Sequence, residues 1–350
     1  MGIKVLELFS GIGGMRCGIV KALGSDGEIS FKAVDLNLLC NEIYSNSFSE
    51  KAECLDISSI SKEWLHNVNA DIWTMSPPCQ PYTRQGNMKG SLDDRAKPLH
   101  HLIEVLRSMK DANIPRLIII ENVKNFEISD SFDQLKHLLE YLQYTLVGYF
   151  LNPLYMGFPN SRLRFFLVAS LGAQKVPFKI LTNDPHMKEY EFIDTYARQR
   201  TISEFLCQNH SQDIESNLLI PDSVLSKKAA MCFDVVSPGS RQCLCFTRAY
   251  TKYINGTGSV LLTRPELAEA FDNMERPLFS VETMTELKDG LRFFCPVEAA
   301  RLNGFSANDE NDDTSLKFPN GCERKAQYYR AVGNAVNPEI IAYLVKRHWP

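Results

Sequence analysis

The fold is decided near the start of the chain by the stretch IKVLELFSGIGGM, residues 3–15. Its apolar first half, residues 3–9, predicts a short buried strand. The glycines that follow allow a tight turn into a helix, and such a turn brings backbone N–H groups close to a bound ligand. We therefore expect the first strand of an α/β sheet, with a ligand-binding loop at its C-terminal edge.

Short apolar runs and amphipathic stretches alternate through the rest of the first half. The predicted strands are Ile3–Phe9, Phe31–Asp35, Ala70–Met75, Leu117–Val123, Thr145–Leu151 and Arg164–Ser170. The predicted helices are Met15–Leu23, Asn37–Ser47, Pro98–Met109 and Phe132–Leu142. This alternation predicts an α/β fold with a doubly wound, mostly parallel sheet and helices on both faces.

The alternation stops after Ser170, and the chain is polar and irregular from about residue 172 to residue 289. From Leu291 onward the sequence again predicts helices, at Val297–Leu302 and Gln327–Arg347. We expect one domain at residues 1–171, a smaller inserted domain at residues 172–290, and a return to the first domain at residues 291–350.

Composition narrows the possible partners. A net charge of −4 argues against a protein that coats polyanions non-specifically, so a nucleic acid would have to meet a local basic surface. The ten cysteines form no CxxC pair and the seven histidines no HxxxH pair, so no metal site is expected and the cysteines are expected to stay thiols. The sequence has no secretion signal and no apolar run of membrane-spanning length, which predicts a cytoplasmic or nuclear location and no membrane partner.

The second predicted strand ends at Asp35, where a carboxylate commonly accepts hydrogen bonds from ribose hydroxyls. A glycine-rich turn alone would also suit NAD or FAD, or no ligand at all. Because the usual GxGxxG spacing is absent, an adenosyl ligand without a pyrophosphate fits at least as well.

The predicted strand Ala70–Met75 leads into Ser76-Pro77-Pro78-Cys79-Gln80-Pro81. Three prolines fix φ around the cysteine and make this loop stiff at the edge of the sheet where ligands bind. A thiol held in this way is a candidate nucleophile. The alternative is a buried structural cysteine, which is the more common case for cysteines in general.

Two further motifs follow at the same expected edge. Glu121 ends an apolar strand, where burial would raise the pKa of its carboxyl group and suit it to donate a proton. Arg162 and Arg164 alternate where a further strand begins at Asn160-Ser161-Arg162-Leu163-Arg164, and they could hold a base carbonyl or a phosphate. The alternatives are a capping or surface glutamate and two ordinary surface arginines.

Taken in order, these motifs resemble the motif series of the cytosine-C5 methyltransferases. The resemblance rests on Phe9–Gly14, Asp35, Pro77-Pro78-Cys79-Gln80, Glu121-Asn122-Val123, Arg162-Leu163-Arg164, Phe294–Phe305 and Gly333–Pro338. Within the family the chain is most similar to the eukaryotic tRNA methyltransferases once named DNA methyltransferase 2, through Cys245-Phe246-Thr247 and Tyr253–Val260. One departure is Asn160, where many members carry glutamine.

The resemblance implies a fold, a reaction and a set of site residues. The fold would be that of S-adenosylmethionine-dependent methyltransferases with a smaller target-recognition domain. Cys79 would attack C6 of a cytosine, Glu121 would meet N3, and Arg162 and Arg164 would meet O2 or a phosphate. S-adenosylmethionine, with S-adenosylhomocysteine as product, would contact Phe9, Gly11, Ile12, Gly13, Gly14, Asp35, Asp56, Ile57, Pro78, Asn334 and Ala335.

The substrate implied by the resemblance is tRNA, in particular cytosine 38 in the anticodon loop of tRNA-Asp, with DNA as a weak secondary partner. A base in a loop also costs least to flip out of its stack. Residues 235–265 hold no Asp or Glu but several basic and aromatic residues, which suits loop nucleic acid, although a solvated loop with core aromatics explains them equally. The expected substrate contacts are Arg84, Cys245, Thr247, Arg248 and Lys252. A DNA cytosine-C5 methyltransferase and a catalytically inactive cofactor-binding protein remain the alternatives.

Overall fold

A computed structural model describes most of the chain. The described residues are 2–24, 28–78, 96–109, 114–195, 197–207, 217–264, 266–268, 284, 287, 290–309, 312, 314–318 and 324–350. They fall into two compact units: the first comprises Met1–Asn152, Leu163–Thr195 and Val336–Pro350, and the second Pro153–Arg162 and Tyr196–Ala335.

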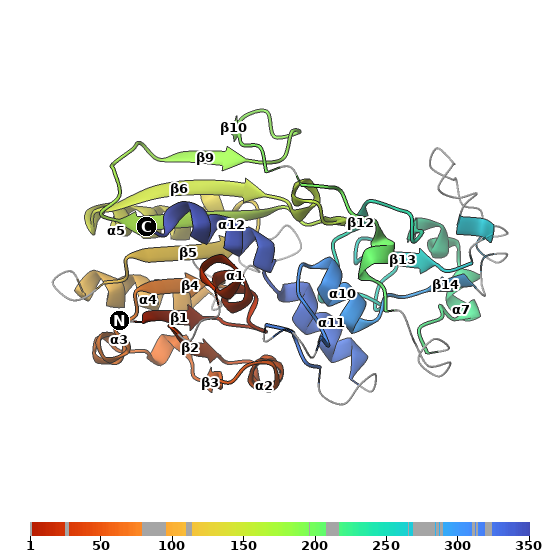
Figure 1. Cartoon of the computed structure of the whole chain (residues 1–350), viewed down its shortest axis with the longest axis horizontal. Helices are drawn as coiled ribbons and strands as arrows, with labels where there is room; N and C mark the ends of the chain where they lie inside the picture. The colour runs from red at the N-terminus through yellow and green to blue at the C-terminus, as the bar shows by residue number, and fades with distance from the viewer. Residues whose placement is uncertain are drawn as a thin grey trace. The chain divides into compact units, whose positions relative to one another are not determined.

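The first unit is built on a mostly parallel sheet, as the sequence predicts. Within the described residues its strands follow the order β10-β9-β6-β8-β5-β4-β1-β2-β3 (Figure 1). The strands are β1 (Ile3–Leu8), β2 (Ile29–Asp35), β3 (Glu53–Cys54), β4 (Ile72–Met75), β5 (Leu117–Asn122), β6 (Tyr144–Leu151), β8 (Arg164–Leu171), β9 (Lys179–Thr182) and β10 (Glu191–Phe192). Among these described strands of the large sheet, β8 alone pairs antiparallel with its neighbours, which are β5 and β6. The carboxyl ends of β1, β2, β4 and β5 therefore lie at the same edge as the start of β8.

Helices pack against the sheet in the first unit. These helices are α1 (Gly14–Leu23), α2 (Leu38–Ser47), α3 (Lys62–Val68), α4 (Lys97–Ser108), α5 (Asp130–Tyr141) and α12 (Pro338–His348). In Figure 1, α1 and α12 lie together in front of the sheet. The apolar sides of α4 and α5 pack into the main core with β4, β5 and β6 through residues such as Leu102, Leu106 and Leu135. The loops at the edge of the sheet are therefore attached to strands whose side chains pack in a buried core.

The predicted helix Gln327–Arg347 is wrong as a single element. The chain instead forms α11 (Lys325–Asn334) and α12, separated by residues 335–337. Ala335 and Asn337 have extended backbone angles, and Asn337 Oδ1 accepts hydrogen bonds from the backbone N–H groups of Glu339 and Ile340. Pro338 is the first residue of α12, where its missing N–H costs nothing. An N-cap followed by proline therefore starts a new helix here.

The second unit has its own small sheets and core. A three-stranded sheet joins β11 (Asp234–Val236), β13 (Ser259–Leu262) and β14 (Leu291–Arg292), and β12 (Cys243–Leu244) pairs with β7 (Asn160–Ser161). The longer helices of this unit are α10 (Pro296–Leu302) and α11, and a short helix, α7, spans Asp222–Leu225. Ile220, Phe233, Val260 and Leu291 form part of a separate buried cluster. The polar, irregular sequence therefore still contains enough apolar residues to fold around a core.

The compact units do not coincide with the three predicted segments. Residues 172–195 supply β9 and β10 to the large sheet and group with the first unit, whereas residues 291–335 group with the second. The functional division into catalytic and target-recognition parts stays a prediction. Across the described residues, none of the helices has both the length and the apolar character required to cross a lipid bilayer.

Candidate active site

The glycine-rich turn between β1 and α1 has the backbone shape that its sequence predicts. Phe9, Gly11 and Gly13 all have positive φ angles, of 57°, 54° and 87°. A Cβ atom on Gly13 would lie 2.3 Å from the ring of Phe48, so only glycine fits there, whereas a Cβ on Gly11 would meet no atom of the described residues within 4 Å. The Ile12 side chain is buried. The turn therefore presents backbone at Gly11 to open space, which is what a closely approaching ligand requires.

Asp35 holds this turn in place. Its Oδ2 accepts a hydrogen bond of 2.8 Å from the Gly11 N–H, and its Oδ1 accepts one of 2.8 Å from the Asn37 N–H. Burial raises the pKa of the Asp35 carboxyl group, against the lowering effect of these bonds. Because each carboxylate oxygen can accept two hydrogen bonds, both retain capacity for a further donor such as a ribose hydroxyl. The buried Ser10 hydroxyl, which has no hydrogen-bond partner among the described residues, is a further polar group at this turn.

The other predicted cofactor contacts come from several elements and from both units. Asp56 is exposed and caps a 3-10 turn by accepting from the Ser58 N–H, and the Ile57 side chain is buried in the main core. Pro78 is half-buried after β4 in the first unit. Asn334 and Ala335 belong to the second unit, where Asn334 is exposed at the end of α11. The structure thus brings Gly11 and Asp35 together within the first unit, whereas Asn334 and Ala335 belong to the second unit.

The proline-rich loop is anchored to the neighbouring strand by a residue whose role the sequence did not indicate. The Asn122 side chain, 1% exposed, donates a hydrogen bond of 3.2 Å from Nδ2 to the Pro77 carbonyl. Cys79 and Arg84 lie outside the described residues. Asn122 therefore fixes the backbone two residues before the predicted nucleophile. In the sequence, the only indication of this role is that Asn122, an amide residue, directly follows Glu121.

Glu121 pairs with Arg164 at the same edge of the sheet. Glu121 is 8% exposed, and its Oε1 lies 3.5 Å from Arg164 Nε. Arg164 Nη1 also donates to the Leu163 carbonyl. Burial favours the neutral form of a carboxyl group, whereas a nearby guanidinium favours the charged form. The sequence indicated only the burial of Glu121, and the structure adds the opposing charge of Arg164.

Arg162 has different surroundings from Arg164. Its buried guanidinium donates from Nη1 to Cys245 Sγ at 3.0 Å, and from Nη2 to the carbonyls of Gly333 at 3.2 Å and Ala335 at 3.0 Å. We expected both arginines on one face of one strand, but β7 ends at Ser161 and β8 begins at Arg164. Arg162 therefore lies between strands. Its contacts in the second unit hold the Cys245 segment and the end of α11 together.

The expected substrate residues of the second unit, together with the aromatic residues near them in the sequence, divide into buried and exposed groups. Phe246 and Tyr250 are buried and pack edge to face, so these two aromatics belong to the core. Arg248, Lys252 and Tyr253 are exposed, with Lys252 Nζ 5.4 Å from the centroid of the Tyr253 ring. Cys245 is half-buried, and the half-buried Thr247 bonds through its backbone N–H to the Thr257 carbonyl. The exposed group is the part that a nucleic acid can reach.

A buried charged cluster beneath the glycine-rich turn escaped the sequence argument. Glu7 is fully buried in β1, and Arg16 donates from α1 to the Tyr44 hydroxyl and to Glu50. The guanidinium also lies over the rings of Phe31, at 4.2 Å from the centroid, and Phe48, at 4.7 Å. In the sequence, this cluster is indicated only by Glu7, a charged residue within an otherwise apolar strand.

The first unit has the fold of the S-adenosylmethionine-dependent methyltransferases, with a carboxyl group and a guanidinium paired at the ligand-binding edge of its sheet. The chain belongs to the family of C-5 cytosine-specific DNA methylases, whose sequence profile matches residues 3–349.

Individual relatives match over their full length. A tRNA (cytosine(38)-C(5))-methyltransferase of Spodoptera frugiperda is 33% identical over 353 residues, which cover 99% of each chain. The enzyme of the same name from Schizosaccharomyces pombe is 32% identical over 346 residues, covering 98% of this chain and 96% of its own. Among solved structures, the Entamoeba histolytica methyltransferase EhMeth superposes with a TM-score of 0.80 at 30% identity, covering 99% of this chain and 97% of its own.

Proposed function

We propose that this protein transfers a methyl group from S-adenosylmethionine to C5 of a cytosine in tRNA, with cytosine 38 of tRNA-Asp as the target. The full-length similarity to relatives named tRNA (cytosine(38)-C(5))-methyltransferase is the single observation that carries the choice of tRNA. The pairing of Glu121 with Arg164 beside the anchored proline-rich loop supports the chemistry.

The glycine-rich turn and Asp35 fit the donor. Open space at Gly11 admits the donor against the backbone, and the remaining acceptor positions of the Asp35 carboxylate suit the two ribose hydroxyls. When bound, S-adenosylmethionine supplies an electrophilic methyl group on sulfur. The predicted contacts of Asp56, Pro78 and the residues at the end of α11 belong to this proposal and await a test.

The base needs activation because C5 of cytosine is a poor nucleophile. In our proposal the Cys79 thiolate forms a bond to C6, and the displaced electron pair makes C5 nucleophilic while negative charge develops at N3 and O2. Glu121 donates a proton or a hydrogen bond at N3, and Arg164 keeps the Glu121 carboxyl group in position. After C5 is methylated, loss of its proton expels the Cys79 thiolate.

Arg162 takes a positioning role in this scheme. Its guanidinium already binds Cys245 and two carbonyl oxygens, which orders the second unit around the Cys245-Phe246-Thr247 segment. The exposed Arg248 and Lys252 beside Tyr253 suit a loop of RNA, since they offer positive charge together with a ring that can stack on a base.

The decisive experiment offers labelled S-adenosylmethionine with tRNA-Asp and with duplex DNA in parallel. We expect label on tRNA-Asp and its loss when cytosine 38 is replaced by uridine. Labelling of DNA with none on tRNA would favour the second candidate, a DNA methyltransferase, which the family description itself suggests. Label on neither would favour an inactive cofactor-binding protein. The cytoplasmic and nuclear location stays a prediction that imaging of a tagged chain would test.

A further inference from the structure

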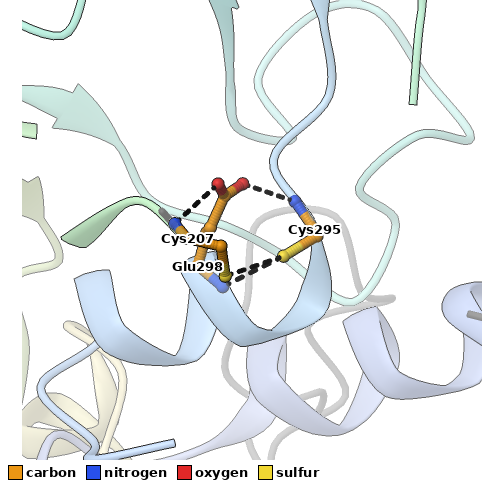
Figure 2. Close-up of side chains that lie close together, drawn as sticks. All are labelled: Cys207, Cys295 and Glu298. Carbon is orange, nitrogen blue, oxygen red and sulfur yellow. Dashed lines mark hydrogen bonds between the residues drawn. The ribbon is translucent and has the colours of Figure 1, made fainter. Parts of the chain in front are cut away.

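Two cysteines of the second unit lie in direct contact outside the candidate active site. Cys207 follows the 3-10 turn Ile202–Phe205, and Cys295 immediately precedes α10. Their Sγ atoms are 3.9 Å apart, although the residues are separated by 88 positions in the sequence (Figure 2). Disulfide formation would require each sulfur to move by roughly 1 Å, because an S–S bond is about 2.05 Å long.

The neighbouring glutamate raises the alternative of a metal site. Within the described part of the chain, Cys207, Cys295 and Glu298 are the group whose potential ligand atoms lie close enough together to hold an ion. Both Glu298 oxygens, however, already accept hydrogen bonds, from Arg292 at 2.7 and 2.8 Å and from the backbone N–H groups of Cys295 at 2.9 Å and Cys207 at 3.2 Å. Figure 2 shows the carboxylate turned towards these two N–H groups. A cation would have to displace Arg292 from a buried ion pair, so the two sulfurs are better suited to react with each other.

The two thiols are not equivalent. Cys207 is half-buried, and Arg301 Nη1 donates a hydrogen bond to its sulfur at 3.7 Å, so this sulfur is the more accessible of the two. Cys295 is 3% exposed, and the contact with Cys207, burial and the Glu298 carboxylate all raise the pKa of its thiol. Cys207 is therefore the better initial nucleophile, and Cys295 is placed to resolve the product.

We propose that Cys207 and Cys295 form a reversible intramolecular disulfide when the chain meets a small disulfide such as oxidised glutathione. The Cys207 thiolate attacks one glutathione sulfur, forming a mixed disulfide and releasing one glutathione, which takes up the proton lost by Cys207. The Cys295 sulfur then attacks the Cys207 sulfur and displaces the second glutathione, which takes up the proton of the Cys295 thiol and leaves as a thiol. The protein pair is oxidised by two electrons and glutathione disulfide is reduced to two thiols.

The bond would stabilise the folded second unit. It would close a long loop between two segments that already touch, and so would restrict the unfolded chain more than the folded one. The backbone contacts of Glu298 with both cysteines would remain, because they use N–H groups and no sulfur. This proposal is independent of the substrate of the enzyme, since its readout requires no methyl transfer.

The test incubates the full chain in glutathione buffers of graded oxidation, blocks free thiols by alkylation and identifies linked peptides by mass spectrometry. We expect a Cys207–Cys295 linked peptide that disappears on reduction, together with a melting temperature several degrees higher in the oxidised form. Cys207→Ser and Cys295→Ser should lose both effects. A serine hydroxyl at position 295 keeps a cap acceptor for the Glu298 N–H, so this variant should fold. Cys232→Ser, which removes an exposed cysteine of the same unit, should behave like the parent.

Complete alkylation of Cys207 and Cys295 under conditions that oxidise Cys232 would overturn the proposal. So would linkage of Cys207 to a different cysteine, or one equivalent of zinc bound by the parent and lost in both serine variants.

Discussion

A carboxyl group in β1, that of Glu7, lies buried beside Arg16 of α1. Glu7 is fully buried, and this burial raises the pKa of its carboxyl group to about 7, against the opposing charge of Arg16. Arg16, Tyr44 and Glu50 are the polar groups that face it. The folded chain therefore binds a proton at Glu7 more tightly than the unfolded chain does, because a free glutamate has a pKa near 4.3.

This difference predicts a pH-dependent stability. Between about pH 4.5 and 7 the unfolded chain ionises Glu7 while the folded chain keeps it protonated, so the free energy of unfolding should fall as pH rises. Glu7→Gln should remove this fall, worth on the order of 3 kcal/mol, when urea unfolding is measured from pH 5 to 8. The matched control is Glu28→Gln, at an exposed carboxylate. An identical pH profile for the parent and Glu7→Gln would show that Glu7 ionises normally in the fold.

Asn122 predicts a separable effect on catalysis. Asn122→Ala removes the bond to the Pro77 carbonyl and so loosens the backbone that carries Cys79, while the donor-binding turn at Gly11 keeps its bond to Asp35. Single-turnover methyl transfer should slow by at least about tenfold, a barrier increase of roughly 1.4 kcal/mol, with donor affinity by calorimetry nearly unchanged. Asn46→Ala, at an exposed amide in α2, is the control. An Asn122→Ala enzyme with the parental rate would remove Asn122 from the account.

Residues whose role depends on nearby sequence were the predictable ones. The placement of Gly11 and Asp35 at one edge of the sheet could be predicted because they lie at the ends of successive parallel strands, although the hydrogen bond between them was not foreseen. The contacts of Arg162 could not be foreseen, since its partners Cys245, Gly333 and Ala335 lie 83 or more positions away. Sequence spacing within a single strand carries no information about such distant partners.

At the scale of elements, α1 and α12 meet at one glycine. A Cβ atom on Gly18 would lie 2.4 Å from Ile341 Cβ and 2.6 Å from the Pro338 carbonyl oxygen. The two helices can therefore approach closely only while residue 18 has no side chain. The contact joins the beginning of the chain to its last helix across the same face of the sheet (Figure 1).

Gly18→Ala should consequently destabilise the fold even though alanine favours helices. We expect a loss of about 1–3 kcal/mol from overpacking, read from chemical denaturation of the full chain. The effect should be a lower midpoint without a change in helix content of the native state by circular dichroism. A more stable Gly18→Ala chain would mean that α1 and α12 can move apart freely.

The predicted elements were most accurate where an apolar run had clear ends. β4 and β5 occupy the expected positions within a few residues because prolines or polar residues follow them. β9 and β10 were missed because they are short and add to the sheet at its margin, where half-exposed side chains blur the pattern. The break between α11 and α12 was present in the sequence as Asn337-Pro338, but the helical periodicity on both sides concealed it.

At the scale of the whole molecule, the family match covers residues 3–349 and so includes both compact units. The order of the motifs along the chain identified this family, whereas composition alone indicated only a globular protein. The fold of the second unit could not be predicted, because its strands are two to four residues long and its core is assembled from distant segments.

The central claim is that the Cys79 thiolate activates the cytosine. Its most direct test is transfer of labelled methyl groups from S-adenosylmethionine to tRNA-Asp by Cys79→Ala, compared with the parent and with Cys232→Ser. The account predicts that Cys79→Ala loses transfer while it still binds the donor through the turn at Gly11 and Asp35, and that Cys232→Ser keeps the parental rate. Methyl transfer by Cys79→Ala at a rate near that of the parent would contradict it.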